Sequence, residues 1–431
     1  MERNFKNVLT LLALLSSTAV IADPSPEEIL ATASRYTVKI QTLNRLGFNQ
    51  DEGGSLDGTG FLIDRKRGWI LTNAHVATRS PSEITVSFKG GQPIKAKRIH
   101  VDALIDMAVM QIPLESIPVN AVEAQLDCQS VPAAGASVLA YGHPWGLSYT
   151  ASRGIVSGIS WFYPQQMIQT DAAINSGNSG GPLISVSSGK IIGLNTATYK
   201  DGSDKNGTAV GLAEMLPPIC GVISLLREGR DTRLRMLPIG IAASKDDLKP
   251  RVADIKGTEL GFHAGDIITK VNGSNRIETL PELFANLRGL EGAVAITVMR
   301  GGKEIDIRTP LIAAPDPLKV KAVNLSGLVI SEPWRLDDEG INPERNLVVD
   351  YIERDTKAEV TEASASDQII SVDGHRFTSS EKLYEYLKQL PTDTTVDLFL
   401  RGFSTSYQMW SVYRHITLKR EKLELISVTD D

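Results

Sequence analysis

The most constraining feature of the sequence is a long run of short, strand-like segments between Tyr36 and Leu212. The segments are rich in apolar and β-branched residues, and Gly, Pro, Asn and Asp separate them. They are residues 38–42, 61–63, 69–71, 84–88, 108–112, 137–141, 155–159, 182–186 and 191–194. Many short strands with turn residues at this spacing predict a β-sandwich or a β-barrel.

Composition excludes several classes of protein. The chain has 431 residues, enough for about three domains. It is 42% hydrophobic, so it is not a disordered chain. The net charge of −6 and the lack of long charge runs argue against a dedicated nucleic-acid binder. The two cysteines, Cys128 and Cys220, are too few for a disulfide scaffold or a cysteine-rich zinc site.

The N-terminal residues have the pattern of a secretory signal peptide. Arg3 and Lys6 precede the apolar run Val8–Leu15, and small or apolar residues lead to Ala22. The alternative is an uncleaved membrane anchor, but the apolar stretch is shorter than the roughly 20 residues that a span needs. We therefore expect cleavage after Ala22 and a soluble mature protein outside the cytoplasm. A disulfide between the two cysteines is permitted there, and two buried free thiols are equally compatible with the sequence.

The C-terminal half contains a weak internal repeat. A helix-like stretch, Ile219–Arg227, and the polar run Glu228–Asp231 separate it from the strand-rich region. Each copy has a turn, a strand, an Asx-Gly turn, a helix and a strand ending in Arg-Gly. The copies, about 100 residues apart, comprise 265–273, 280–287 and 296–301, then 366–374, 380–390 and 396–402. This order predicts two similar α+β modules.

The sharpest chemical signal is the glycine-rich loop Gly177-Asn178-Ser179-Gly180-Gly181-Pro182. A serine nucleophile needs an exposed hydroxyl on a tight turn, with backbone N–H groups nearby to bind an oxyanion. We predict that Ser179 is this nucleophile. The N–H groups of Gly177 and Ser179, with that of Asn178, are the candidate oxyanion hole.

Two further segments supply partners for such a serine. His75 follows an apolar strand, and Asp106 precedes another. Histidine can act as base and then acid, and an aspartate would orient it. The chain order His75, Asp106, Ser179 is that of chymotrypsin-type enzymes. The α/β-hydrolase order differs, and there a helix follows the serine, whereas Pro182 and a β-rich run follow here.

These segments resemble the HtrA/Deg family of secreted serine proteases. The matching motifs are Thr72–Val76, Asp102–Val109 and the long run Gln169–Leu183, in which Ser176 replaces a frequent proline. The resemblance implies a mainly β fold, with a chymotrypsin-like double β-barrel followed by two α+β PDZ domains. The expected divisions are a signal peptide at 1–22, the protease domain at 23–230, and PDZ domains at 231–315 and 316–431.

The resemblance also assigns binding residues. Gly142–Leu147 resembles a loop on the substrate side. An apolar specificity pocket predicts cleavage after Val, Ala or Ile. Its candidate residues, with the adjoining strand, are Ile174, Leu194, Asn195 and Thr196.

PDZ domains bind C-termini by adding a strand to a sheet edge. The candidate carboxylate-binding loop of the first domain is Pro238, Ile239, Gly240 and Ile241. In the second it is Leu325–Leu328, but Ser366-Asp367 replaces the usual Gly-Asp, which leaves peptide binding or a structural role open.

We therefore predict an ATP-independent serine endopeptidase that degrades unfolded proteins in the periplasm by an acyl-enzyme mechanism. It needs no cofactor and no metal, and it binds no nucleic acid; His100 and Asp102 are interpreted as a solvated strand end. Expected partners are unfolded proteins and C-terminal peptides, within a homotrimer or a larger assembly. The alternatives are a chaperone or peptide-binding scaffold with weak or ligand-gated proteolysis, and an anchored stress sensor.

Overall fold

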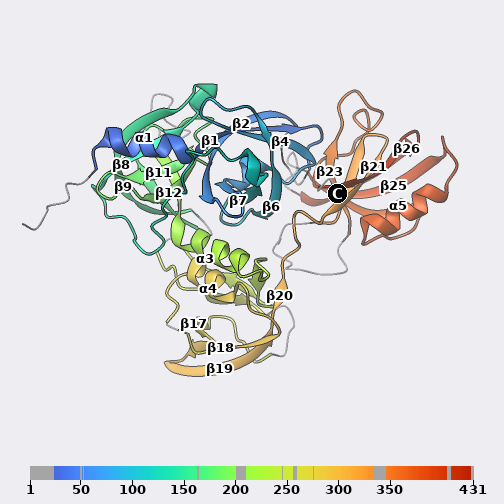
Figure 1. The fold of residues 1–431 in the computed structure, drawn as a ribbon. Coiled ribbons are helices and arrows are strands. Elements are labelled where there is room, and N and C mark those ends of the chain that lie inside the picture. The colour runs from blue at the N-terminus through green and yellow to red at the C-terminus, as the bar shows by residue number, and fades with distance from the viewer. Residues whose placement is uncertain are drawn as a thin grey trace, which may run out of the picture.

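The computed structural model describes residues 24–48, 51, 53–162, 165–199, 210–244, 246–255, 260–274, 276–333, 346–404 and 409–428. The predicted signal peptide, residues 1–22, lies outside the described residues. Figure 1 shows a large β-rich lobe with two smaller α+β modules. The first module lies below helix α3, and the second lies beside strands β2 and β4 of the large lobe.

The described chain opens with a helix that the sequence analysis did not anticipate. Helix α1 (Pro26–Tyr36) begins with a capping box, in which Ser25 accepts a hydrogen bond from the backbone of Glu28 and the Glu28 side chain bonds back. Its buried residues Ile29, Ala33 and Tyr36 pack on the core of the first sheet. The Ser-Pro-Glu-Glu sequence is a typical helix start, so the signal was present.

The first sheet has seven antiparallel strands in the order β5-β4-β1-β2-β3-β7-β6. Alternating burial along β1 and β4 reflects one face packed on a hydrophobic core and one face turned outward. The strands are β1 (Thr37–Asn44), β2 (Gly54–Asp64), β3 (Trp69–Thr72), β4 (Ser82–Phe88), β5 (Ile94–Lys95), β6 (Lys97–Asp102) and β7 (Met107–Gln111). The one-turn helix α2 (Ala74–Ala77) follows β3.

The second sheet, hereafter the second barrel, closes on itself in the order β10-β13-β12-β11-β8-β9. Short 3-10 turns occur at Leu114–Ser116 and Pro144–Gly146. The barrel strands are β8 (Ser137–Gly142), β9 (Thr150–Phe162), β10 (Gln165–Thr170), β11 (Pro182–Ser185), β12 (Ile191–Tyr199) and β13 (Val210–Met215). The expected chymotrypsin-like, mainly β architecture is therefore present.

Helix α3 (Leu216–Arg227) leaves the second barrel and packs its apolar side on the core of the first sheet. A disulfide joins Cys220 of α3 to Cys128 in the connection between the two sheets. The sequence left open whether these two cysteines form a disulfide or remain free thiols, and in the structure they form the disulfide. The predicted helical stretch, Ile219–Arg227, lies inside the observed bounds of α3.

The first α+β module has a five-stranded sheet, in the order β15-β16-β17-β18-β19, covered by helix α4 (Leu280–Leu287). The helix has the bounds that its sequence pattern predicted, and Thr279 and Glu282 form a capping box at its start. The strands are β15 (Gly240–Ala242), β16 (Arg251–Asp254), β17 (Ile267–Val271), β18 (Ala293–Arg300) and β19 (Lys303–Pro310). A two-stranded pair closes the module, formed by β14 (Arg235–Met236) and β20 (Ile312–Ala313).

The second module repeats this arrangement with two additional strands. Its sheet has the order β26-β25-β24-β23-β22-β21-β27, with helix α5 (Ser380–Gln389) packed against it. The strands are β21 (Lys321–Leu325), β22 (Leu328–Ser331), β23 (Val348–Ile352), β24 (Gln368–Val372), β25 (Thr395–Ser404), β26 (Met409–Lys419) and β27 (Leu423–Ser427). Strand β22 is therefore paired on both edges, whereas β15 of the first module is an edge strand.

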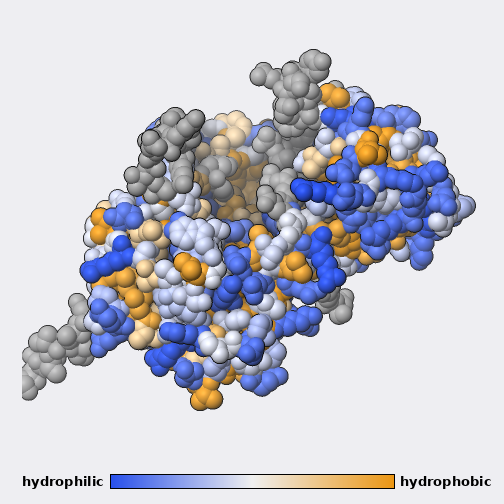
Figure 2. Space-filling model, turned by 90° about the horizontal axis from the view of Figure 1, so that it is seen from above, coloured by the Kyte–Doolittle hydropathy of each residue, from blue (hydrophilic) through white to orange (hydrophobic). Residues whose placement is uncertain are grey.

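Seen from above, the second module presents a mainly hydrophilic surface, and hydrophobic residues are more frequent on the large lobe (Figure 2). Among the described residues, no helix combines the length and the apolar character needed to cross a membrane.

Candidate active site

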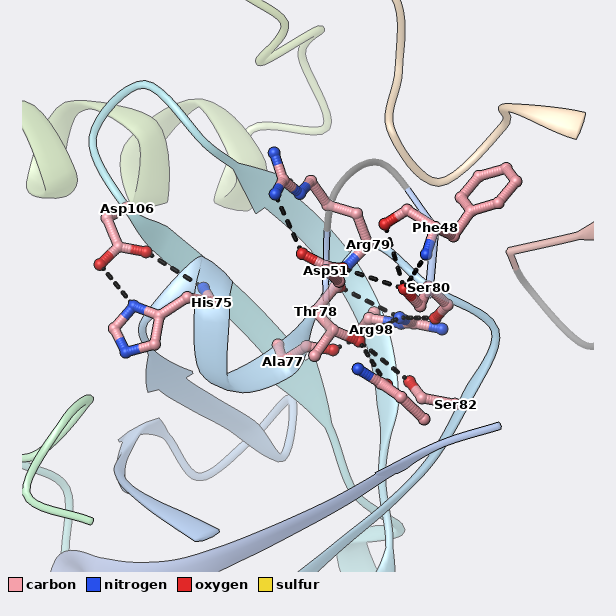
Figure 3. Close-up of polar contacts among 11 residues, drawn as sticks. Phe48, Asp51, His75, Ala77, Thr78, Arg79, Ser80, Ser82, Arg98 and Asp106 are labelled. Carbon is pink, nitrogen blue, oxygen red and sulfur yellow. Dashed lines mark hydrogen bonds and ion pairs between the residues drawn. The ribbon is translucent and has the colours of Figure 1, made fainter. Parts of the chain in front are cut away.

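His75 and Asp106 form a closely bonded pair on the first sheet. Strand β3, whose four residues are all buried, ends at Thr72. His75 lies in the short helix α2, which follows this strand. Asp106 lies on the turn between β6 and β7 in a left-handed backbone conformation, φ 40°. Its Oδ2 lies 2.8 Å from Nδ1 of His75, and its Oδ1 accepts the His75 backbone N–H at 3.1 Å (Figure 3). Two contacts to one residue fix both the position and the orientation of the imidazole.

This pairing sets the protonation behaviour of His75. Burial lowers the pKa of the imidazole, but the hydrogen bond and the charge of Asp106 outweigh it, so the pKa of His75 is raised. The side chain is nevertheless 48% exposed, so the ring remains accessible from outside. An accessible imidazole held by a carboxylate is suited to general acid–base chemistry.

Asn73 connects this pair to the second barrel. Its side chain is fully buried, and its Nδ2 donates to the backbone oxygen of Asp106 at 2.8 Å and to Oγ1 of Thr196 at 2.9 Å. Thr196 belongs to β12, and its backbone oxygen accepts a hydrogen bond from Oγ of Ser179 at 2.9 Å. One asparagine thus links the strand beside Ser179 to the turn that carries Asp106.

The Ser179 loop needs its glycines. Gly177 has φ 99° and Gly180 has φ 81°, both in the left-handed region that favours glycine. A Cβ atom on Gly177 would lie 2.3 Å from the backbone oxygen of His143, and one on Gly180 would lie 2.1 Å from that of Thr59. The backbone N–H of Thr59 also donates to the backbone carbonyl oxygen of Ser179 at 2.9 Å. The loop therefore packs directly against β2 of the first sheet.

The peptide groups of this loop have defined orientations. The backbone oxygen of Ser176 accepts the Trp145 N–H at 2.7 Å. The Ser176 C=O and the Gly177 N–H belong to one trans peptide group, so the Gly177 N–H points away from Trp145. The N–H of Asn178 donates to the Asn175 oxygen at 2.9 Å. Of the three candidate oxyanion donors, Asn178 is thus already engaged, and Gly177 and Ser179 are the better candidates.

Thr59 and His143 support this loop, and sequence reasoning gave neither of them this role. Oγ1 of Thr59 donates to the Gly177 oxygen at 2.7 Å and accepts the His143 N–H at 3.1 Å. His143 is fully buried, with Nδ1 3.2 Å from the same hydroxyl and its ring edge-on to Tyr149. Burial lowers the pKa of His143 to about 4, so the ring is neutral near pH 7. His143 is therefore an internal support and cannot touch a substrate.

The candidate pocket residues differ in accessibility. Leu194 and Asn195 are fully buried, and Nδ2 of Asn195 donates to the Pro182 oxygen at 3.1 Å. Ile174 is 4% exposed and packs in the core of the second barrel. Thr196 is partly exposed and lies against Ser179. The geometry brings only Thr196 of these four into hydrogen-bond contact with the Ser179 side chain.

Glu214 is a further buried carboxyl group that the sequence analysis missed. It lies on β13 and is 6% exposed. Burial, together with the charges of Asp106 and Asp102, raises the pKa of Glu214 well above its usual value. Glu214 therefore keeps its proton to a higher pH than an exposed glutamate does.

The expectation for His100 and Asp102 as a solvated strand end is wrong. Both are buried, because the first α+β module and its linker cover them. Nδ1 of His100 lies 3.1 Å from Oγ1 of Thr232, and Asp102 forms an ion pair with Arg288 at 2.5 Å. Burial lowers the pKa of His100. Oδ1 of Asp102 also accepts the Leu104 N–H at 2.9 Å, so this ion pair holds the turn that leads to Asp106.

The two candidate carboxylate-binding loops are not equivalent. In the first module, buried Ile239 precedes the edge strand β15, and Gly240 and Ile241 belong to that strand. In the second module, Leu325–Leu328 is the tight turn of the β21–β22 hairpin. There the Ser326 N–H donates to the Lys422 oxygen, and the Gly327 N–H donates to the Asn324 side chain. Those backbone donors are therefore already used.

Comparisons with known proteins agree with this architecture. Residues 58–194 match the model of the trypsin-like peptidase domain. The fold and this match define the chain as a trypsin-like serine peptidase. A probable periplasmic serine endoprotease, DegP-like, from Pseudomonas savastanoi is 30% identical over 385 residues, which cover 82% of this chain and 77% of that protein. The chain therefore belongs to the HtrA/Deg family of serine proteases.

Other relatives extend over similar lengths. The periplasmic pH-dependent serine endoprotease DegQ of Escherichia coli is 28% identical over 376 residues, covering 81% of this chain and 79% of that protein. Among solved structures, the HtrA-type protease AlgW with tripeptide shares the fold, with a TM-score of 0.55 and 24% identity. That match covers 68% of this chain and 99% of AlgW. The protein is a serine endopeptidase that degrades proteins.

Proposed function

We propose that this endopeptidase uses Ser179 as nucleophile, His75 as general base and acid, and Asp106 as the orienting carboxylate. The observation that carries the proposal is the double contact of Asp106 with the ring and the backbone of His75. A carboxylate in this position selects the tautomer whose Nε2 can accept a proton, and it stabilises the imidazolium that forms.

The reaction then follows the acyl-enzyme route. A substrate backbone N–H that binds the Thr196 oxygen would replace the Ser179 hydroxyl there and free it to rotate toward His75. Oγ attacks the scissile carbonyl while Nε2 of His75 takes its proton, and the N–H groups of Gly177 and Ser179 stabilise the oxyanion. His75 returns the proton to the leaving amine, and water repeats the sequence to release the acyl group.

The hydrogen bond between Ser179 and Thr196 also favours the second candidate, a ligand-gated enzyme with a scaffold function. In that arrangement the hydroxyl donates to a backbone oxygen and not to the imidazole. Substrate or activator binding would then shift the serine toward His75. A pure chaperone would function without this step.

We propose the domain divisions 23–230, 231–315 and 316–431, with PDZ character for both modules. The open edge of β15, next to Pro238 and Ile239, supports binding of C-terminal peptides by the first module. In the second module β21 already occupies the edge of β22, which supports a structural role. Unfolded proteins are the proposed substrates, and a trimer or larger assembly remains a prediction.

The proposed location is the periplasm, after cleavage of residues 1–22. The disulfide between Cys128 and Cys220 supports an oxidising compartment, and the relatives described above are named as periplasmic. N-terminal sequencing of exported protein tests this: a first residue of Asp23 supports cleavage, and an intact N-terminus supports an anchor.

The test of the activity uses the mature protein and Ser179→Ala with a reduced, alkylated unfolded protein. Cleavage by the native form, lost by several orders of magnitude in Ser179→Ala, would support the proposal. Ser187→Ala, on the turn between β11 and β12, is the matched control and should cleave normally. Equal cleavage by Ser179→Ala would refute the assignment. Absence of cleavage by every form, with aggregation still suppressed, would favour the scaffold.

A further inference from the structure

The segment that follows His75 is held in an unusual backbone conformation. Helix α2 ends at Ala77, and the next residue, Thr78, has φ 58° and ψ 166°. A β-branched residue at positive φ is rare, because its side chain crowds its own backbone. Such a conformation persists only where surrounding contacts fix it. The residues that fix Thr78 therefore also fix the helix that carries His75.

Arg98 on β6 provides one set of these contacts. Its Nη1 donates to the backbone oxygens of Ser80 at 2.6 Å and Thr78 at 3.1 Å, and it lies 3.3 Å from that of Ala77. Arginine is always charged and presents several N–H groups in one plane, so a single side chain can hold successive carbonyl groups. Arg98 thus holds the carbonyl end of α2 and the strained turn beyond it (Figure 3).

The segment before β2 provides a second set. Ser80 is fully buried, and its hydroxyl bonds the backbone N–H of Phe48 at 3.0 Å and Oδ2 of Asp51 at 3.2 Å. Asp51 in turn accepts the backbone N–H of Arg79 at 2.5 Å and forms an ion pair with its side chain at 2.9 Å. Residues 79–80 are thereby attached to Phe48 and Asp51 (Figure 3).

Both sets of contacts end on the second α+β module. Nη2 of Arg98 donates to the backbone oxygen of Val428 at 2.8 Å. Phe48 is fully buried in a cluster with residues of that module, and a Cβ atom on Gly47 would lie 2.7 Å from the ring of Tyr351. The partners of Phe48 in the cluster are Val320, Ala322, Val329 and Val428. Figure 1 shows this module directly beside β2 and β4.

We propose that the second α+β module is a structural part of the active site, with Arg98 as a positioning residue for His75 and Phe48 as the docking residue. The inference rests on the proposed role of His75. The module supports Arg98 and Phe48, and these two residues, together with Asp51, hold the turn from Thr78 to Ser80. Loss of docking relaxes that turn, so the imidazole spends less time aligned with Ser179. Chemistry then slows, while the surfaces that bind substrate remain unchanged.

The inference predicts a specific kinetic pattern with a short chromogenic peptide amide that ends in valine. Arg98→Ala and Phe48→Ala in the mature chain should each lower kcat at least about tenfold, because small misplacements of a catalytic group slow chemistry strongly. KM should stay within about twofold, since ground-state binding is untouched. Arg98→Lys should recover part of kcat, because it keeps the charge but lacks the second nitrogen that donates to the Val428 oxygen.

Arg65→Ala is the matched control. Nη1 of Arg65 also bridges two backbone oxygens, those of Pro118 at 3.0 Å and Ala121 at 2.8 Å, but it lies just beyond β2, at the opposite end of β3 from His75. This variant should lose comparable thermal stability and keep kcat within about twofold of the native value. Equal loss of kcat in Arg65→Ala and Arg98→Ala would overturn the positioning role.

The link to the second module has its own test. The double variant Phe48→Ala/Arg98→Ala should lose little more kcat than either single variant, because both act on one turn. If the loss of kcat in the double variant equals the product of the losses in the two single variants, the link is overturned. If Arg98→Ala does not fold, Arg98→Lys and Phe48→Leu should still lower kcat about threefold, and unchanged values would refute the inference. Cleavage by the native chain no faster than by Ser179→Ala would refute the proposed function instead.

Discussion

Thr59 offers the most direct test of how the Ser179 loop is held. The substitution Thr59→Val keeps the shape of the side chain and removes its hydroxyl. In the native structure this hydroxyl donates to the Gly177 oxygen and accepts the His143 N–H, and both groups are buried. The variant therefore leaves one buried acceptor and one buried donor without this partner.

Each such unsatisfied group costs about 1–3 kcal/mol, so two of them give about 2–6 kcal/mol if the loop stays in place. The protein can avoid part of this cost if residue Gly177 as a whole shifts so that its carbonyl oxygen meets another partner. That movement would misplace the N–H of Gly177. Loss of one oxyanion donor lowers kcat by about 10²–10³. We therefore expect Thr59→Val to lose stability, kcat or both.

The assay combines urea unfolding with kcat and KM on a chromogenic peptide. Thr269→Val is the control, because its hydroxyl also donates to a buried backbone oxygen, that of Thr297 at 3.1 Å, but within the first α+β module. The control should lose stability of the order of 1 kcal/mol and keep its kcat. If Thr59→Val changes the free energy of unfolding by less than about 1 kcal/mol and kcat by less than twofold, the reasoning fails.

Three further predictions follow from other groups. Because Asp106 raises the pKa of His75, activity should fall to half at a pH above the usual value of about 6.5; an acid limb centred below that value would contradict the shift. The contact between His75 and Asp106 stabilises the folded state fully at pH values below the pKa of His75 in the unfolded chain. This contribution is lost as the pH rises through the pKa of His75 in the folded protein. Replacing Cys128 and Cys220 by serine should lower the free energy of unfolding by about 4 kcal/mol, since the bridge closes a loop with a sequence separation of 92; an unchanged urea midpoint would refute this. Arg288→Met should cost about 3–5 kcal/mol in urea unfolding, because it leaves buried Asp102 without its ion pair, and a cost below about 1 kcal/mol would show that the carboxylate finds another partner.

Local sequence patterns were sufficient where a short segment determines its own structure. Helix α4 has the predicted bounds because its apolar spacing and its capping residues are all local. His75 and Asp106 were paired from motifs that end or begin a strand, and the structure brings them within 2.8 Å. The roles of these residues in catalysis remain predictions until they are tested.

Contacts between distant segments could not be read in the same way. Thr59 reaches Gly177, 118 residues away, through one hydroxyl, and no pattern around Thr59 distinguishes it from other strand threonines. His100 was assigned to the surface because nothing in its segment indicates that Thr232 covers it. Helix α1 differs from these cases, since its capping box is a local pattern that is present in the sequence itself.

The disulfide has a practical consequence for any study of self-cleavage. Cys128 lies before the first strand of the second barrel and Cys220 lies after its last, so the bridge turns that whole barrel into a covalent ring. A single cut between these cysteines opens the ring but releases no fragment. Such a nicked chain keeps its full mass on a non-reducing gel and separates into two pieces only after a thiol is added. Purified protein that looks intact without a reductant can therefore already be cleaved next to its own nucleophile.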